Sequence, residues 1–242
     1  MKMLRRILVI LLALCVMLCA AFSTAFGSED EDDWDTWDDE EEFDDEFSEE
    51  EEKVDFRTIA GFDTGEKFDF GPYQYQLSED GQFAVVISYT GDETEVIVPE
   101  KMGEYPVAEI GDFSFQDNPV VESIVIPAGV QSIGRSAFKG CANLKKVELS
   151  EGVTVLQYGC FGGCVALESV TLPESLEIVE DFAFAVCPCL KELNFGSNLK
   201  SIGMQALAYC AALDKVTIPD EENVEIASDA FLNSPEAKVV NE

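Results

Sequence analysis

Apolar residues recur through the second half of the chain with a 23-residue period. Each unit contains a segment of the form L-x-x-V-x-L, in which apolar and polar positions alternate at the end. Alternation of this kind predicts a short strand with one buried face. A Pro follows the segment at Pro127, Pro173 and Pro219, and its missing N–H ends the strand ladder. The period links Leu144, Leu167, Leu190 and Leu213, then Val147, Val170, Leu193 and Val216, and then Phe115, Phe138, Phe161, Phe184 and Leu207.

The period predicts a coil in which each unit makes one turn. Strands stacked in this way run parallel and lie about 4.8 Å apart. A single turn has no closed core, so it is stabilised mainly by its neighbours. The Phe series is expected to stack inside the segments that return the chain to the next strand. Ile226 and Phe231 continue the apolar series after one extra residue near Glu221.

The unit L-x-x-V-x-[LI]-P-x-x-[VL]-x-x-I-x-x-x-A-F-x-x-C resembles the repeat of BspA-like leucine-rich-repeat surface proteins. The best copies are residues 144–164 and 167–187, and the resemblance covers roughly residues 94–240. It implies an α/β-type repeat solenoid, that is, a right-handed leucine-rich-repeat coil with a parallel sheet on its concave face. The return segments are expected to be short or irregular. The family resemblance also implies an exported or surface-displayed protein that binds or adheres.

The segment before the repeats resembles the family's N-terminal lead-in. Residues 72–99 carry turn signals at Asp80-Gly81 and Gly91-Asp92, and predict a β-hairpin that caps the first turn. We therefore divide the chain into a signal peptide (1–27), an acidic disordered arm (28–55), an N-terminal cap (56–93) and a leucine-rich-repeat solenoid (94–242).

The beginning of the chain, residues 1–27, has the layout of a secretory signal peptide. A short positive head precedes an apolar run from Ile7 to Phe22, and small residues follow. We expect cleavage after Ala25 or Gly27. The run is short for a membrane span, which needs about 20 residues, so an uncleaved anchor is the weaker alternative. The protein is expected to be secreted or at the cell surface of a bacterium, with no membrane span after signal removal.

An acidic segment follows, in which most residues from Glu29 to Glu52 are Asp or Glu. Like charges at this density predict a disordered, extended arm. The arm also carries Trp34, Trp37, Phe43 and Phe47. It is either a solvating spacer, which we favour, or a linear motif that docks in a cationic groove. Any calcium binding is expected to be weak, because no EF-hand spacing is present.

Four cysteines occupy one equivalent position in successive units: Cys141, Cys164, Cys187 and Cys210. Asn118 and Ser234 take this position at the two ends. In an exported protein disulfides are the default expectation. The regular spacing instead favours buried thiols, which behave as small hydrophobes. We predict that all six cysteines outside the signal peptide are reduced and protected in the native state, and that no zinc site is present.

The outward positions of the strand segments are the candidate ligand-facing residues on the concave face. They form two columns: Ser123, Lys146, Ser169, Glu192 and Lys215, and beside them Val125, Glu148, Thr171, Asn194 and Thr217. In a third column, Glu122, Lys145, Glu168, Lys191 and Asp214, the charge alternates from turn to turn. Opposite charges on neighbouring strands stabilise a sheet, so we interpret the third column as structural.

Net charge and residue types exclude several classes of function. The formal net charge is −34, which excludes nucleic-acid and anionic-lipid binding and favours a monomer. The chain contains no His, and no nucleophile motif or phosphate loop is present. We therefore predict no catalytic site, no cofactor and no metal. The expected function is a non-catalytic binding or adhesion module for an extracellular protein or glycan. The alternative is that the acidic arm sequesters cations or basic peptides, with the solenoid as its carrier.

Overall fold

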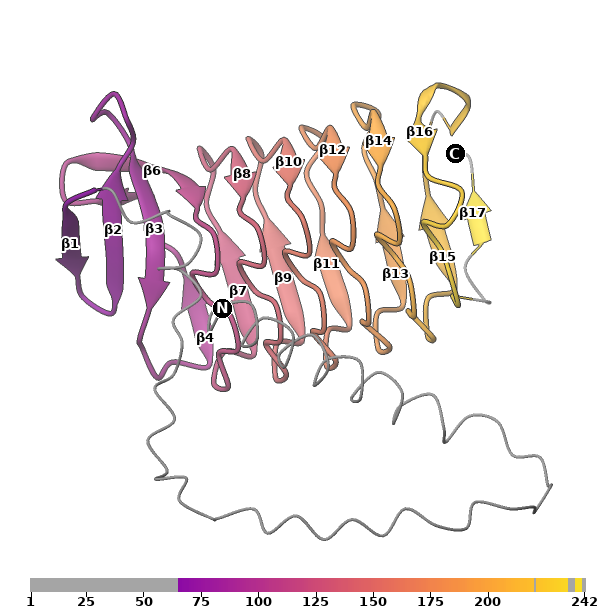
Figure 1. The fold of residues 1–242 in the computed structure, drawn as a ribbon, viewed down its shortest axis with the longest axis horizontal. Helices are drawn as coiled ribbons and strands as arrows, with labels where there is room; N and C mark the ends of the chain where they lie inside the picture. Colours follow the sequence, from indigo (N-terminus) through magenta and orange to yellow (C-terminus); the bar gives the residue numbers. More distant parts are fainter. Residues whose placement is uncertain (1–64, 220, 235–237, 241–242) are drawn as a thin grey trace, which may run out of the picture. The chain divides into compact units, whose positions relative to one another are not determined.

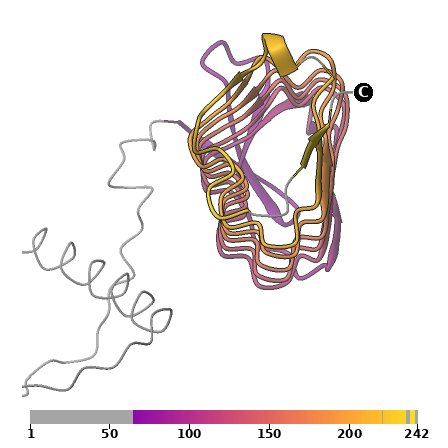
Figure 2. The same cartoon turned by 90° about the vertical axis from the view of Figure 1, so that its right-hand side faces the viewer.

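The computed structural model describes residues 65–219, 221–234 and 238–240. The expected signal peptide and acidic arm lie outside these residues. Within them the chain forms a β-solenoid whose turns follow the period of the sequence. Figure 1 shows the successive turns side by side, and Figure 2, an end-on view, shows them stacked around one core. The coil contains one helical segment in the described residues, the 3₁₀ turn η1 (Glu221–Asn223). The α/β part of the expected fold class was therefore wrong, whereas the repeat solenoid with parallel strands is confirmed, and the architecture is a β-solenoid.

Two rows of parallel strands run along the coil. The first row contains the strands that the alternating segments predicted: β4 (Glu95–Ile97), β7 (Ser123–Ile126), β9 (Lys146–Leu149), β11 (Ser169–Thr171), β13 (Glu192–Asn194), β15 (Lys215–Thr217) and β17 (Lys238–Val240). The second row lies within the return part of each turn: β6 (Tyr105–Ile110), β8 (Ser132–Ile133), β10 (Val155–Leu156), β12 (Ile178–Val179), β14 (Ser201–Ile202) and β16 (Glu225–Ile226). The return segments are thus more regular than the sequence predicted.

The first row divides into two sheets. Strands β4, β7, β9 and β11 form one sheet, and β13, β15 and β17 form the other. The division coincides with a change of side chain, since Phe195 stands at the position that Ile126, Leu149 and Leu172 hold in the preceding turns. The second row is continuous across the same turns, because β12 pairs with β14.

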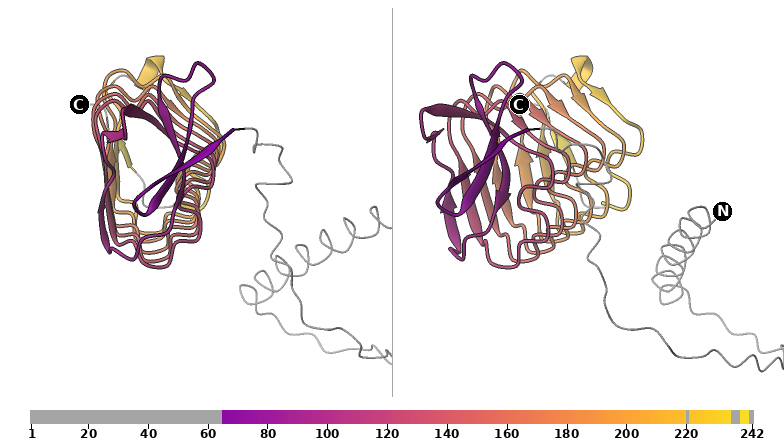
Figure 3. Two further views of the ribbon diagram at one scale, coloured as in Figure 1. Left: turned by 90° about the vertical axis from the view of Figure 1, so that its left-hand side faces the viewer. Right: turned by 60° about the vertical axis from the view of Figure 1, so that its left-hand side comes forward.

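The N-terminal strands differ from the repeats. Strand β1 (Lys67–Phe70) pairs antiparallel with β2 (Tyr73–Leu77), which forms a hairpin with β3 (Ala84–Tyr89). Strand β3 then pairs in parallel with β6, and the short strand β5 (Lys101–Met102) pairs antiparallel with β6. The turn signal near Gly91 does not close a second hairpin, because β4 pairs in parallel with β7. Figure 3 shows β1, β2 and β3 crossing the N-terminal end of the coil.

A ladder of aromatic rings runs through the core. The rings of Phe115, Phe138, Phe161 and Phe184 stack in order, with centroids 4.9, 5.1 and 5.3 Å apart. Tyr89 extends the stack, with its centroid 5.0 Å from that of Phe115. The neighbouring small residues are fully buried: Ala137, Cys160, Ala183, Ala206 and Ala230. One large ring per turn therefore fits beside one small side chain in the turns that carry the ladder.

Between its second-row strand and the next first-row strand, each turn contains a short stretch that we call the return wall. It comprises residues 112–117, 135–140, 158–163, 181–186, 204–209 and 228–233. Its backbone links the turns: the N–H groups of Phe138 and Phe161 donate to the carbonyls of Cys160 and Ala183, at 2.7 and 2.8 Å. Other residues of the stretch bond locally instead, as Lys139 N–H does to the carbonyl of Ser136. The return wall is thus a third hydrogen-bonded side of the coil.

Candidate binding surfaces

The structure brings the two predicted columns of ligand-facing residues into register on the first strand row. Ser123 pairs with Lys146, which pairs with Ser169, and Val125, Glu148 and Thr171 align in the same way. Glu192 pairs with Lys215, and Asn194 with Thr217, in the second sheet. We call this surface the strand face. Its members therefore form two continuous rows within each sheet.

Exposure varies along the strand face. Lys146, Ser169, Thr171, Glu192 and Asn194 are exposed. The partly buried members are Ser123, Val125, Glu148 and Lys215. Thr217 departs from the expected pattern, because it is only 6% exposed and its hydroxyl donates to Asn194 Oδ1 at 2.8 Å. The middle turns therefore offer the polar groups best placed to meet a partner.

The third column forms ion pairs between neighbouring turns. Lys145 Nζ lies 2.7 Å from Glu122 Oε2, and Lys191 Nζ lies 2.7 Å from Glu168 Oε2. The hydrogen bond from Lys191 and its charge lower the pKa of the Glu168 carboxyl. Lys146 also pairs with Glu148 on the strand face itself. These contacts support the structural interpretation of the alternating charges.

The cysteine column points inward. Cys141, Cys164, Cys187 and Cys210 are all buried, and each thiol donates to the carbonyl of a Phe in the preceding turn, at 3.0 to 3.3 Å. Ser234 does the same at the C-terminal end, where its hydroxyl donates to the carbonyl of Leu207 at 2.6 Å. Burial raises the pKa of Cys141 to about 12 and that of Cys210 to about 11. In these five turns the position therefore holds a small side chain that donates a hydrogen bond.

One cysteine departs from the prediction of full protection. Cys189 follows Pro188 and is exposed, whereas the fifth buried thiol, Cys160, occupies the small position beside the ring ladder. All six cysteines of residues 65–234 are free thiols. The prediction that all six cysteines are protected in the native state is therefore wrong at Cys189, which is exposed.

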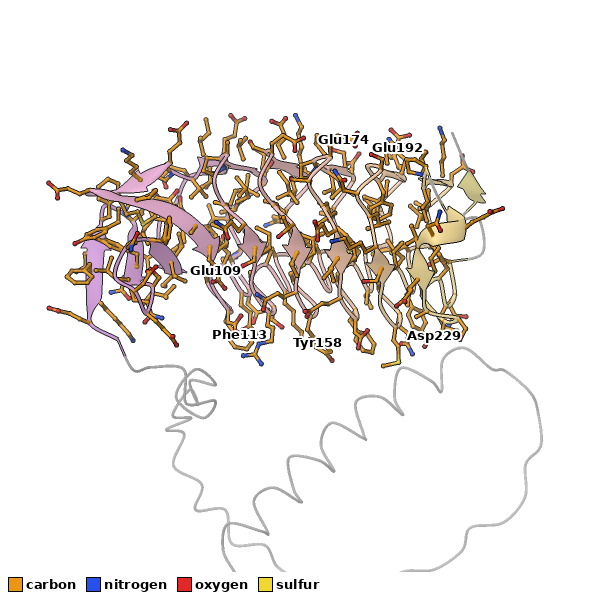
Figure 4. The ribbon with its side chains drawn as sticks, turned by 90° about the horizontal axis from the view of Figure 1, so that it is seen from above. Glu109, Phe113, Tyr158, Glu174, Glu192 and Asp229 are labelled. Carbon is orange, nitrogen blue, oxygen red and sulfur yellow. The ribbon has the colours of Figure 1, made fainter. Side chains whose placement is uncertain are left out.

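Large apolar side chains gather on the return wall, which sequence reasoning missed. Tyr158, Val186, Met204 and Tyr209 are 47 to 52% exposed, and Leu232 is 39% exposed. Figure 4 shows Phe113 and Tyr158 along one long side of the coil, with Glu174 and Glu192 along the opposite side. The apolar residues escaped notice because equivalent positions in other turns hold small or polar residues, so no apolar series marks them.

A small polar hollow lies at the N-terminal end. It has a volume of about 310 Å³ and is bounded by residues 88–91 and 114–120. Its lining offers the hydroxyls of Ser88 and Thr90, the amides of Gln116 and Asn118, and one carboxylate, that of Asp117. Such a set suits hydrogen bonding. Among the described residues, no cluster of three or more His, Cys, Asp or Glu side chains could hold a metal ion.

Within the part of the chain that the structure describes, no helix has the length and apolar character that a membrane span requires.

Comparison with solved structures identifies leucine-rich repeat proteins of bacteria. The leucine-rich repeat protein of T. pallidum is 26% identical, with a TM-score of 0.68 over 73% of this chain and 82% of that one. A leucine-rich repeat protein from Bacteroides ovatus is 22% identical, with a TM-score of 0.53 over 71% of this chain and 52% of that one. The search of curated proteins found no match.

A family model covers the repeats themselves. The BspA-type leucine-rich repeat region matches residues 108–238 with six copies, which is more than half of the chain. These residues carry the ring ladder, the cysteine column and most of both strand rows. The resemblance noted in the sequence is confirmed, and the protein is a member of the BspA-type leucine-rich repeat family.

Proposed function

We propose that this protein is an exported, non-catalytic adhesion or binding module whose strand face meets an extracellular protein or glycan. Family membership supports the general class, because repeat proteins of this type generally serve as binding scaffolds. The observation that carries the choice of face is the register of its polar columns. Ser169, Thr171, Glu192 and Asn194 stand exposed on strands held by a buried core.

Rigidity makes such a surface suited to recognition. Polar side chains of β9 and β11 point outward, while Val147 and Leu167 hold the turns from within. A side chain on a fixed strand loses little freedom on binding, because its backbone is already ordered. Outward positions also vary without disturbing the core, so the three middle turns contribute different groups: Lys, Ser and Glu in one column, and Glu, Thr and Asn in the other.

Two matched double variants test the choice of face. Ser169→Arg with Thr171→Arg places two bulky cations on the exposed part of β11, and Ala128→Arg with Gln131→Arg adds the same charge at exposed positions outside the strand rows. Each protein, together with the unaltered one, is used to capture extracellular proteins and is applied to a glycan array. We expect the first pair to lose the captured partner and the second pair to keep it. Equal capture by both variants would remove the strand face from the proposal.

Deleting residues 28–55 separates the proposal from its alternative. If the solenoid carries recognition, the shortened protein keeps its partner. If the acidic arm sequesters cations or basic peptides, the deletion abolishes binding. The arm's density of carboxylates between Glu29 and Glu52 is the feature that motivates the alternative.

Export has its own test. N-terminal sequencing of protein recovered from the medium or cell surface is expected to begin at Phe26 or Ser28. Recovered protein that still carries Ile7 to Phe22 would contradict the cleaved signal peptide.

A further inference from the structure

The return wall has an unusual backbone. The second and sixth residues of nearly every stretch have positive φ, which L side chains disfavour. Glycine meets this requirement at Gly140, Gly159 and Gly163, with φ between 60° and 74°. Asp117 and Asn233 meet it with short polar side chains that tolerate the left-handed region. The coil therefore requires this geometry whatever the residue.

Two turns place large apolar residues at the sixth position. Val186 has a φ of 60° and Tyr209 a φ of 58°. A β-branched or bulky residue with positive φ is strained, and strain of this kind persists where the surrounding structure imposes it. Neither side chain compensates by packing, since Val186 is 47% exposed and Tyr209 is 48% exposed. Folding alone therefore gives no reason to prefer these residues over Gly or Asn.

The strained residues belong to a larger apolar patch, comprising Tyr158, Phe182, Val186, Met204, Tyr209 and Leu232. Its members come from four successive turns that are joined by backbone hydrogen bonds. Phe182 N–H donates to the carbonyl of Met204 at 2.9 Å, and Tyr209 N–H donates to that of Leu232 at 2.8 Å. The rings of Tyr158 and Phe182 contact each other, with centroids 5.4 Å apart. The patch is thus continuous along the coil.

Carboxylates accompany the patch. The four stretches that contain it hold Asp181 and Asp229 but no Lys or Arg. Both carboxylates are fixed: Asp181 Oδ1 accepts the N–H of Met204 at 2.7 Å, and Asp229 Oδ2 accepts Gln205 Nε2 at 3.2 Å. The stretch 135–140 differs, since it carries Arg135 and Lys139. An apolar surface next to fixed negative charge complements a partner that combines apolar side chains with cations.

We propose that the apolar patch of the return wall is a second interaction surface, which binds a cationic amphipathic segment of a partner protein. Aliphatic or aromatic side chains of that segment cover Val186, Met204 and Tyr209, and its Lys or Arg side chains meet Asp181 and Asp229. This surface lies on residues other than those of the strand face, so it does not depend on the function proposed above.

Three synthetic helical peptides probe the patch. The first has a leucine face and a lysine face, the second replaces lysine with glutamate, and the third replaces leucine with serine. The first is expected to bind the full chain at least roughly tenfold more tightly than either of the others, a difference of about 1.4 kcal/mol. Equal affinity for the first and third peptides would show simple charge attraction and would overturn the proposal.

Variants locate the binding. The double variant Val186→Asn with Tyr209→Asn introduces residues that tolerate positive φ, as Asn233 does. It is therefore expected to fold but to lose binding of the leucine–lysine peptide. Ile97→Asn is the control that should keep the peptide, because Ile97 is 74% exposed on strand β4, away from the return wall. Ser169→Arg with Thr171→Arg is expected to leave peptide binding unchanged, which separates this surface from the strand face. Unaltered peptide binding by the Val186 and Tyr209 variant would contradict the proposal.

Discussion

The core of the coil and its return wall follow the same 23-residue period, but the core repeats similar residues at equivalent positions and the wall does not. Inside, every turn from Phe115 to Phe184 places a ring in the same stack, and the departure at Leu207 is conservative. On the return wall, equivalent positions hold Gly163, Val186 and Tyr209, although the backbone has positive φ at all three. Packing thus fixes the residue type in the core. On the wall the residue type varies, and it includes bulky residues that the positive φ of the backbone disfavours. This difference points to a role for the wall beyond folding.

The largest expected change in the free energy of unfolding comes from the buried thiols at alkaline pH. Their pKa values are raised by burial, from 9.0 to about 12 for Cys141 and about 11 for Cys210. A thiol that stays protonated in the folded protein contributes its full stabilisation below pH 9. That contribution falls as the pH rises towards the folded pKa, because the unfolded chain ionises first. Between pH 9 and its folded pKa, each thiol lowers the free energy of unfolding by about 1.4 kcal/mol per pH unit.

Denaturant unfolding between pH 8 and pH 10 measures this loss, which should reach several kcal/mol for the five buried thiols together. Replacing Cys141, Cys164, Cys187 and Cys210 with Ser, which occupies the equivalent position at Ser234, should flatten the dependence. An equally steep loss in the Ser variant would show that other groups control alkaline unfolding.

Removing one ring from the stack should have the next largest effect. Phe161 is fully buried between Phe138 and Phe184. Phe161→Ala leaves a cavity and is expected to destabilise the fold by about 3–5 kcal/mol. Phe161→Leu should cost less, because Leu207 already occupies this column. Equilibrium unfolding in urea gives both values. Similar losses for Ala and Leu would contradict the stacked-core interpretation.

The surface ion pairs should contribute far less. Glu168 and Lys191 have side chains 52% and 65% exposed, so solvent and salt screen their attraction. A double-mutant cycle with Glu168→Gln and Lys191→Met is expected to give a small coupling at low salt that disappears at high salt. A coupling that persists in high salt would show that this column is more than a solvated sheet contact.

The exposed thiol should have no measurable effect on stability. Cys189→Ser is expected to leave the unfolding transition unchanged and to remove the native reactivity towards a thiol reagent from the described part of the chain. Denaturation should then release the five buried thiols. Rapid native labelling of Cys164 or Cys187 would show that the coil opens locally.

The core could be predicted from sequence because burial repeats the same residue in each turn. Phe138, Cys164 and Val147 belong to series that mark the inside, and η1 lies where the extra residue was expected, near Glu221. Pro127 and Pro173 follow the first-row strands as predicted. The second strand row was less visible, because β8, β10, β12 and β14 each have two residues and a single buried side chain, too few to show alternation.

The binding surfaces were harder to predict for a different reason. Polar positions between buried ones identified the strand face, but burial at the last turns depends on neighbours that the pattern does not describe, as Thr217 shows. In the sequence, the positive φ of the return wall is indicated only by the glycines Gly140, Gly159 and Gly163. Val186 and Tyr209 carry no such mark, because a bulky residue gives no sign in the sequence that its backbone is left-handed.

The comparison between core and wall is tested most directly by relieving the strain of the wall. Val186→Gly with Tyr209→Gly should raise the free energy of unfolding by about 1 kcal/mol or more, because glycine adopts positive φ freely. Val165→Gly is the matched control, since Val165 is 45% exposed but has no positive φ, and it should lower stability. If the double variant instead loses stability as Val165→Gly does, the wall residues support the fold, and their role as a binding surface is contradicted.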